Sequence, residues 1–207
     1  MKTRVEPSIL IATGNRGKVR ELTELLRPVP ALFKCLADFP GVHEVEETGS
    51  TFHENAGLKA SGYARQTGLW SIADDSGLEI KALNGAPGVL SARYGGESAG
   101  FPEKMKLVLA AMEKAADRGR EARFVCSMVL ADNDGRWVAE AEGECVGKIA
   151  YRPKGGEGFG YDPIFIPDGF DKTFGELSDQ TKHKISHRAR AAEKIIPYLL
   201  DFTGAST

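Results

Sequence analysis

The chain has few cysteines and no pattern that would use them. Its three cysteines, Cys35, Cys126 and Cys145, are odd in number, widely spaced and free of any CxxC or Cys/His arrangement. A disulfide framework uses an even set in a small secreted chain, and a structural zinc site uses closely spaced pairs. The sequence therefore indicates neither, and we expect reduced cysteines.

Long apolar runs and a charge excess are missing as well. The run after Met1–Pro7 is only about five residues long, too short for a signal peptide or a membrane span. We therefore expect a cytoplasmic protein with no membrane contact. The formal net charge of −2 gives no global positive field to hold a long nucleic acid. Any phosphate binding has to be local.

What is present is the composition of an ordinary globular protein. Hydrophobic residues make up 42% and charged residues 27% of the 207 positions. Internal repeats, low-complexity tracts and Ser/Pro-rich linkers do not occur. The sequence predicts one domain over residues 1–207, with flexible ends at 1–7 and 203–207.

The apolar periodicity predicts an α/β fold. Strands are expected at residues 8–13, 69–73, 124–130 and 137–146, with a further alternating stretch at 78–82. Helices are expected after the loop at 13–18, from Thr51 to Gly68, over 103–116 and from Ser186 onward. Strands and helices do not alternate strictly, and Asp132–Gly135 reads as a hairpin turn. This favours a mixed sheet with flanking helices and an antiparallel hairpin.

The loop Thr13-Gly14-Asn15-Arg16-Gly17-Lys18 is the first candidate site. It joins a predicted strand to a helix, so backbone N–H groups, the positive end of a helix dipole and the Lys18 ammonium would meet at one place. Such a place suits a phosphate. The loop is not a Walker A motif, because Val19 stands where a metal-binding Ser or Thr is needed. The alternative is a tight connection without a ligand.

Carboxylates form the second candidate. Asp74, Asp75 and Ser76 follow the strand predicted at 69–73, and Glu44, Glu46 and Glu47 precede the helix that starts at Thr51. Carboxylates next to phosphate are suited to Mg²⁺. The alternative for Glu44–Glu47 is a solvated charge run, whereas the Asp pair between an apolar strand and Ser-Gly is poorly placed for solubility alone.

Further along the chain three more groups qualify. Asn55 and Lys59 are one turn apart on a predicted helix and would share a face, although an exposed Lys59 is the simpler reading. Phe159, between two glycines, suits a stacking platform for a base, and the alternative is a core position. Lys182, His187 and Arg188 lie around the predicted start of the last helix, where donors point outward.

Taken in order, these blocks resemble the inosine/xanthosine triphosphate pyrophosphatases, which act on non-canonical purine nucleotides. The resemblance spans nearly the whole chain. It rests on blocks at residues 9–18, 46–49, 52–60, 73–78, 85–88, 91–94, 159–165 and 186–188. Any one of these blocks is a weak signal, and the ordered set is specific.

The resemblance implies hydrolysis of ITP, dITP or XTP to the monophosphate and pyrophosphate, with Mg²⁺, by a homodimer. It implies an elongated mixed sheet with two lobes around a central nucleotide cleft. Asp75 would be the proton acceptor and a metal ligand, and Glu46 the other ligand, with Glu47 as the alternative. Positions matching substrate-binding residues are Thr13, Gly14, Asn15, Arg16, Gly17, Lys18, Lys59, Ser76, Phe159, Gly160, Tyr161, Asp162, Lys182, His187 and Arg188.

Two other readings compete. A Maf-type nucleotide pyrophosphatase acting on other modified nucleotides would share the phosphate chemistry, but the blocks around Phe159 and His187 count against it. A nucleotide sensor without catalysis would keep the phosphate loop and would not need the Asp74–Asp75 pair.

Overall fold

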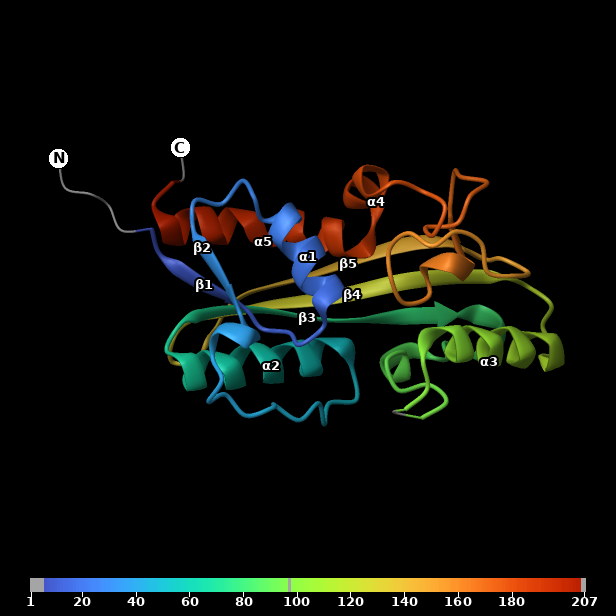
Figure 1. Cartoon of the computed structure of the whole chain (residues 1–207), viewed down its shortest axis with the longest axis horizontal. Coiled ribbons are helices and arrows are strands. Elements are labelled where there is room, and N and C mark those ends of the chain that lie inside the picture. The colour runs from blue at the N-terminus through green and yellow to red at the C-terminus, as the bar shows by residue number, and fades with distance from the viewer. Residues whose placement is uncertain (1–5, 97, 206–207) are drawn as a thin grey trace. The chain divides into compact units, whose positions relative to one another are not determined.

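The protein is an α/β structure with strands and helices mixed along the chain (Figure 1). The computed structural model describes residues 6–96 and 98–205. The strands are β1 (Ser8–Ile11), β2 (Leu32–Cys35), β3 (Trp70–Ile80), β4 (Glu121–Ala131), β5 (Trp137–Ile149) and β6 (Phe165–Pro167). The helices are α1 (Arg16–Leu25), α2 (Phe52–Thr67), α3 (Phe101–Lys114), α4 (Asp179–Ile185) and α5 (His187–Thr203).

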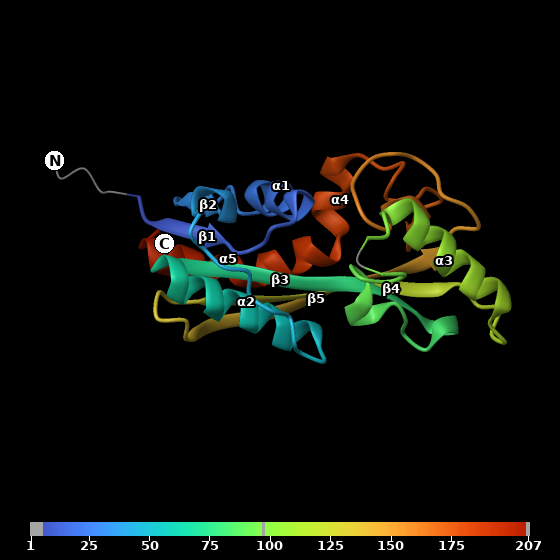
Figure 2. The same ribbon diagram turned by 60° about the horizontal axis from the view of Figure 1, so that its bottom comes forward.

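A single mixed sheet has the strand order β2-β1-β3-β4-β5-β6. Strand β1 is parallel to both β2 and β3, whereas β5 and β6 are antiparallel. The turn between β4 and β5 is closed by a hydrogen bond from Asp132 N to Arg136 O at 2.9 Å. Figure 2 shows the long strands β3, β4 and β5 in the sheet. The predicted mixed sheet with a hairpin is thereby confirmed.

The chain forms two compact units. Unit 1 holds the chain up to Asp75, Ser127–Glu142 and the residues from Arg190 onward, and unit 2 holds Ser76–Cys126 and Gly143–Ala189. Strands β3, β4 and β5 and helix α5 therefore contribute residues to both. The predicted single domain, and the predicted lobes around a nucleotide cleft, remain predictions.

In unit 1, α2 covers one face of the sheet, and α1 and α5 lie on the other (Figures 1 and 2). Leu10 of β1 and Ala12, just after the strand, pack with alanines of α2 at positions 56, 60 and 64. Small side chains let the helix approach the strands closely. Thr51 caps α2 with a full capping box, and Gly68 ends it in a left-handed conformation at φ 69°, as the sequence predicts.

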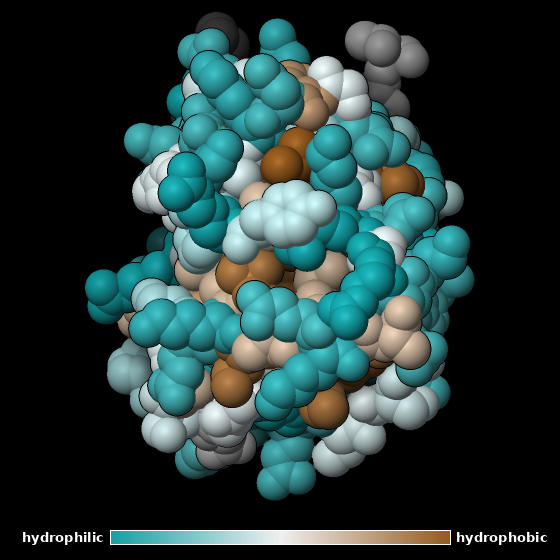
Figure 3. Space-filling model, turned by 90° about the vertical axis from the view of Figure 1, so that its right-hand side faces the viewer, coloured by the Kyte–Doolittle hydropathy of each residue, from teal (hydrophilic) through white to brown (hydrophobic). Residues whose placement is uncertain are grey.

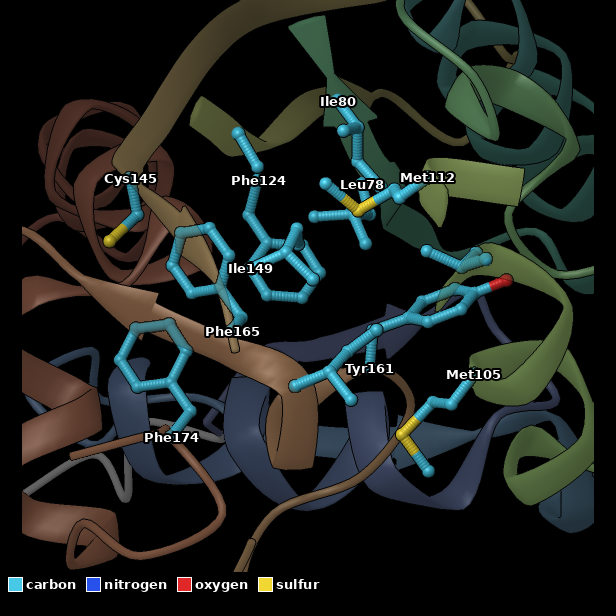
Figure 4. Packing of buried hydrophobic residues seen from close by; sticks show 13 residues of the cluster. Leu78, Ile80, Met105, Met112, Phe124, Cys145, Ile149, Tyr161, Phe165 and Phe174 are labelled. Carbon is cyan, nitrogen blue, oxygen red and sulfur yellow. The ribbon is translucent and has the colours of Figure 1, made fainter. Parts of the chain in front are cut away.

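The core of unit 2 is aromatic. Phe124, Phe165 and Phe174 pack together, with ring centroids 4.6 Å apart for Phe124 and Phe165 and 5.4 Å apart for Phe165 and Phe174. Figure 4 shows these rings beside Tyr161 and the side chains of Met105 and Met112 from α3. Rings of this size bury much apolar area at fixed mutual angles, so they fix the strands that carry them.

A hollow of about 300 Å³ lies beside α3 in unit 2, lined in part by Leu109, Met112 and Tyr151. Figure 3 views the end of unit 2 that carries α3, where apolar side chains lie in a depression among hydrophilic ones. Arg120 is another lining residue, and its Nε and Nη2 donate to the carbonyls of Ile149 and Ala150 at 2.5 and 2.7 Å. The guanidinium at this hollow is therefore bound to backbone carbonyls.

Some sequence-based expectations were wrong. The predicted strand at 69–73 does not end before the acidic pair, because β3 runs unbroken from Trp70 to Ile80. Asp74 and Asp75 are therefore mid-strand residues. Strands β2 and β6 and helix α4 were not predicted, since each is short and has no clear period. Of the predicted flexible ends, residues 1–5 and 206–207 lie outside the described residues, and Thr203 is the buried last residue of α5.

Candidate active site

The loop Thr13–Lys18 leads from β1 into α1, as predicted, but much of its hydrogen bonding is internal. Asn15 is the N-cap of α1: its Oδ1 accepts from Gly17 N at 2.9 Å and from Lys18 N at 3.2 Å. Thr13 Oγ1 accepts from Asn15 N at 3.2 Å. Three of the amides expected to face a phosphate are thus bonded within the loop. What the loop offers an anion is then chiefly the charge of Lys18 and the helix dipole.

Lys18 is held over the middle of β3. Its Nζ lies 3.1 Å from Asp74 Oδ2 and 3.3 Å from Asp74 O. Asp74 is fully buried, and β1 pairs with β3 just before it, through Ile11 and Ile72. The buried carboxylate therefore fixes the lysine of the loop to the strand that carries the acidic pair.

Asp75 is 7% exposed and stands among charged groups of unit 1. Its Oδ1 lies 3.3 Å from Lys59 Nζ, and its Oδ2 lies 3.4 Å from Asn55 Nδ2. Burial raises the pKa of Asp75 above the ordinary carboxyl value, and Lys59 and Lys18 only partly oppose this shift. A carboxylate with a raised pKa is a better proton acceptor than an ordinary aspartate.

Lys59 connects Asp75 with the acidic segment before α2. Its Nζ lies 2.9 Å from Glu47 Oε1, and its side chain is only 7% exposed. Burial alone would lower the pKa of Lys59, but the carboxylates of Asp75, Glu47 and Asp74 outweigh it and raise that pKa. Lys59 is not the exposed lysine of the simpler reading. Glu47 reaches this ammonium, whereas Glu46 is exposed.

A pocket of about 290 Å³ lies in unit 1 beside these groups. Thr13 and Gly14 of the loop line it, together with Glu47 and Lys59. The loop and the Glu47–Lys59 pair thus face the same space. Its remaining lining residues are Leu36, Val42, His43, Glu44, Val45 and Tyr63.

The second group of predicted residues lies in unit 2, around a buried ion pair. Lys182 Nζ lies 2.5 Å from Asp162 Oδ2, and both side chains are 3% exposed. The same Oδ2 accepts from Phe159 N at 2.8 Å. Gly158 precedes this bond at φ 71°, and a Cβ there would lie 2.0 Å from Asp162 Oδ2. Asp162 therefore fixes the conformation of the loop that carries Phe159.

Phe159 is half-buried and has two cations at its ring. Lys182 Nζ is 4.7 Å and Arg188 Cζ is 5.6 Å from its centroid. Arg188 Nη2 donates to Ser76 Oγ at 2.9 Å. His187 stacks on Phe124 with ring centroids 4.8 Å apart. Phe159, Lys182, Arg188 and Ser76 thus form a connected set within unit 2, while the His187 ring lies against Phe124 of the aromatic core.

Two predicted site residues direct their side chains into the core. Tyr161 belongs to the aromatic core (Figure 4), and its hydroxyl donates to Ser91 O at 3.0 Å. Burial raises the pKa of this phenol. Asp162 is bound to Lys182, as described above. These two residues can therefore contact a ligand only through their backbone atoms.

Asn55 is the residue that sequence reasoning undervalued. It is fully buried, and its side chain bonds both Gly49 N, at 2.8 Å, and Asp75. The signal was present in its spacing of one helical turn from Lys59. That spacing predicts a contact between Asn55 and a buried charge only if this face of the helix is buried, and the sequence does not show that it is.

Together, the fold and the site define a mixed α/β protein with a buried carboxylate–lysine centre beside a capped strand-to-helix loop. The Ham1 family model matches residues 9–198, and the chain belongs to this family.

Relatives agree over most of the chain. A dITP/XTP pyrophosphatase of Gloeobacter violaceus is 48% identical over 188 residues, which are 91% of this chain and 92% of the relative. One of Bacillus anthracis is 45% identical over 188 residues, 90% of this chain and 93% of the relative. The solved HAM1 protein of Coxiella burnetii superposes with a TM-score of 0.86 at 44% identity, covering 94% of this chain and 99% of that one.

No helix in the described part of the chain is both long and apolar enough to cross a membrane. Among residues 6–96 and 98–205 there is no cluster of three or more His, Cys, Asp or Glu side chains that would hold a metal by itself.

Proposed function

We propose that the protein hydrolyses ITP, dITP and XTP to the nucleoside monophosphate and pyrophosphate, which removes these nucleotides from the pool. The observation that carries the proposal is the Asp75–Lys59–Glu47 cluster, in which a buried carboxylate of raised pKa is joined through Lys59 to the pocket that Thr13 and Gly14 also line. The names of the relatives, dITP/XTP pyrophosphatases, supply the substrate class.

Mg²⁺ is the proposed cofactor, with Asp75 and Glu47 as its protein ligands. Asp75 and Glu47 share one buried ammonium, so two negatively charged groups lie close together. The usual ligands of Mg²⁺ are one or two carboxylates together with substrate oxygens and waters. Glu47 replaces Glu46 in this role, because Glu47 is the residue that reaches Lys59. The ion would neutralise phosphate charge.

Asp75 is the proposed base. It takes a proton from a water molecule whose oxygen forms a bond to the α-phosphorus, while the bond from that phosphorus to the bridging oxygen breaks and pyrophosphate leaves. Lys18 then balances charge on the departing phosphates, and Asp74 keeps its ammonium in place. Lys59 holds Asp75 and Glu47 in one arrangement.

Base recognition is proposed for Phe159, Ser76, Lys182, His187 and Arg188. The ring of Phe159 offers a stacking surface, and Lys182 and Arg188, whose cations lie over that ring, supply donors for a 6-keto oxygen. A donor-lined pocket rejects adenine, because the 6-amino group of adenine leaves those donors without an acceptor. The homodimer and the cytoplasmic location remain predictions from the resemblance and the composition.

A pyrophosphate-release assay with ITP, XTP, dITP, ATP, GTP and dTTP, with and without Mg²⁺, tests the function. We expect release from the first three only, and only with the metal. Orthophosphate as the primary product, or equal rates on ATP and ITP, would contradict the proposal. Preference for a modified pyrimidine nucleotide would favour the Maf-type reading, and binding without product release would favour a sensor.

Two neighbouring glutamates provide a matched test of the metal ligand. Glu47→Gln is expected to raise the Mg²⁺ concentration at half-maximal activity by about 10- to 100-fold, since a ligand to the ion is lost. Glu46→Gln removes the same charge from an exposed position and is expected to leave that concentration unchanged. A larger effect at Glu46 in Mg²⁺ titrations of both variants would restore Glu46 as the ligand.

A further inference from the structure

The segment that carries Glu47, residues 41–50, belongs to neither a helix nor a strand, yet exposed and partly buried residues alternate from residue 44 to residue 50. Residues 45, 47 and 49 are partly buried, while 44, 46, 48 and 50 are exposed. A period of two is that of an extended chain, whose successive side chains point to opposite sides. The pattern explains why Glu47 faces Lys59 and its neighbour Glu46 does not.

Helix α2 supplies the contacts that fix this pattern. Tyr63 OH accepts from Val45 N at 3.3 Å, and a Cβ at Gly62 would lie 2.7 Å from Val45 Cγ2. Four side chains of α2 contact every second residue of the segment in antiparallel order: Asn55 at Gly49, Lys59 at Glu47, Tyr63 at Val45 and Gln66 at His43.

The two repeats match in length. Four residues of an α-helix rise about 6 Å, and two residues of an extended chain span about 6.6 Å. One helical turn therefore advances as far as one pair of segment residues. A slip of the segment by one residue would break every one of these contacts and would turn Glu46, in place of Glu47, toward Lys59.

Gln66 holds the far end of the segment. Its Oε1 accepts from His43 N at 2.8 Å, and its Nε2 donates to His43 O at 3.1 Å, as a neighbouring strand would. The side chain is exposed, and its hydrogen bonds both go to the backbone of His43. Unlike Asn55 and Lys59, Gln66 can thus be changed without removing a group that itself contacts Asp75 or Glu47.

We propose that Gln66 is a positioning residue that sets the register of residues 43–49 on α2, and so holds Glu47 beside Asp75 for the divalent cation. The expected effect on Mg²⁺ binding rests on the proposed function. The register itself is a property of the protein without metal, and it can be measured there.

Gln66→Ala is the test. Loss of two hydrogen bonds is expected to raise the Mg²⁺ concentration at half-maximal pyrophosphate release by about three- to tenfold, while kcat at saturating Mg²⁺ stays at the wild-type level. In the metal-free protein, amide hydrogen exchange at His43, Val45 and Gly49 is expected to accelerate. Gln66→Glu keeps the acceptor and loses the donor, so it should fall between wild type and Gln66→Ala.

Arg65→Ala is the matched control. Arg65 is exposed on the same turn of α2 and donates from Nε to Asp134 O at 3.2 Å, away from the segment. Unchanged amide exchange in Gln66→Ala overturns the inference, as does a shift of equal size in Arg65→Ala. A wild type that releases no pyrophosphate would defeat the proposed function instead, and the exchange measurement would still decide the register.

Discussion

Asp75→Asn is expected to lower kcat for pyrophosphate release from ITP by about 10²- to 10⁴-fold, the contribution of a general base. Asparagine keeps the size of the side chain, and its single oxygen can accept from one of the two donors, Lys59 or Asn55. It cannot take a proton from water. Binding of a non-hydrolysable ITP analogue should stay measurable, because Lys18 and the base-binding residues are untouched. Steady-state kinetics and calorimetric binding check the two expectations.

The control for this variant is Asp168→Asn. Asp168 is exposed, and its backbone N donates to Val146 O. The same chemical change there should leave kcat unaltered. Turnover retained by Asp75→Asn would remove Asp75 from the role of base.

Lys182→Met is expected to destabilise the protein by about 3–5 kcal/mol, because it leaves the buried Asp162 carboxylate without the cation 2.5 Å away. Urea unfolding measures the loss in the free energy of unfolding. Stacking on Phe159 should weaken as well, since the Asp162 bond to Phe159 N shapes that loop. The KM for ITP is therefore expected to rise.

A second substitution distinguishes the cost of losing the ion pair from the cost of leaving a buried charge at Asp162. In Asp162→Asn/Lys182→Met the carboxylate is gone and an amide oxygen can still accept from Phe159 N, so most of the lost stability should return. Lys184→Met, on an exposed position of the same helix, should change stability by less than about 0.5 kcal/mol. A double variant as unstable as Lys182→Met would refute the expectation.

The sequence by itself determined the elements whose signals are local. The capping box at Thr51, the stop at Gly68 and the turn at Asp132–Gly135 depend on neighbours within a few residues, and all three are found as predicted. The candidate residues were also identifiable, because a resemblance needs only residue types in order. The acidic pair was misplaced at a strand end, since Asp and Ser normally interrupt a strand pattern.

Only the tertiary structure decided which groups meet. Asp74 and Asp75 tolerate the middle of β3 because Lys18 and Lys59, distant in the chain, bring ammonium groups to them. The choice between Glu46 and Glu47 depends on the register of an extended segment on α2, and a shift of one residue reverses it. Contacts between residues far apart in the chain leave no periodic or local signal in the sequence. The sequence therefore identified the charged residues, whereas the packing of α2 on β3 determined which of them form pairs.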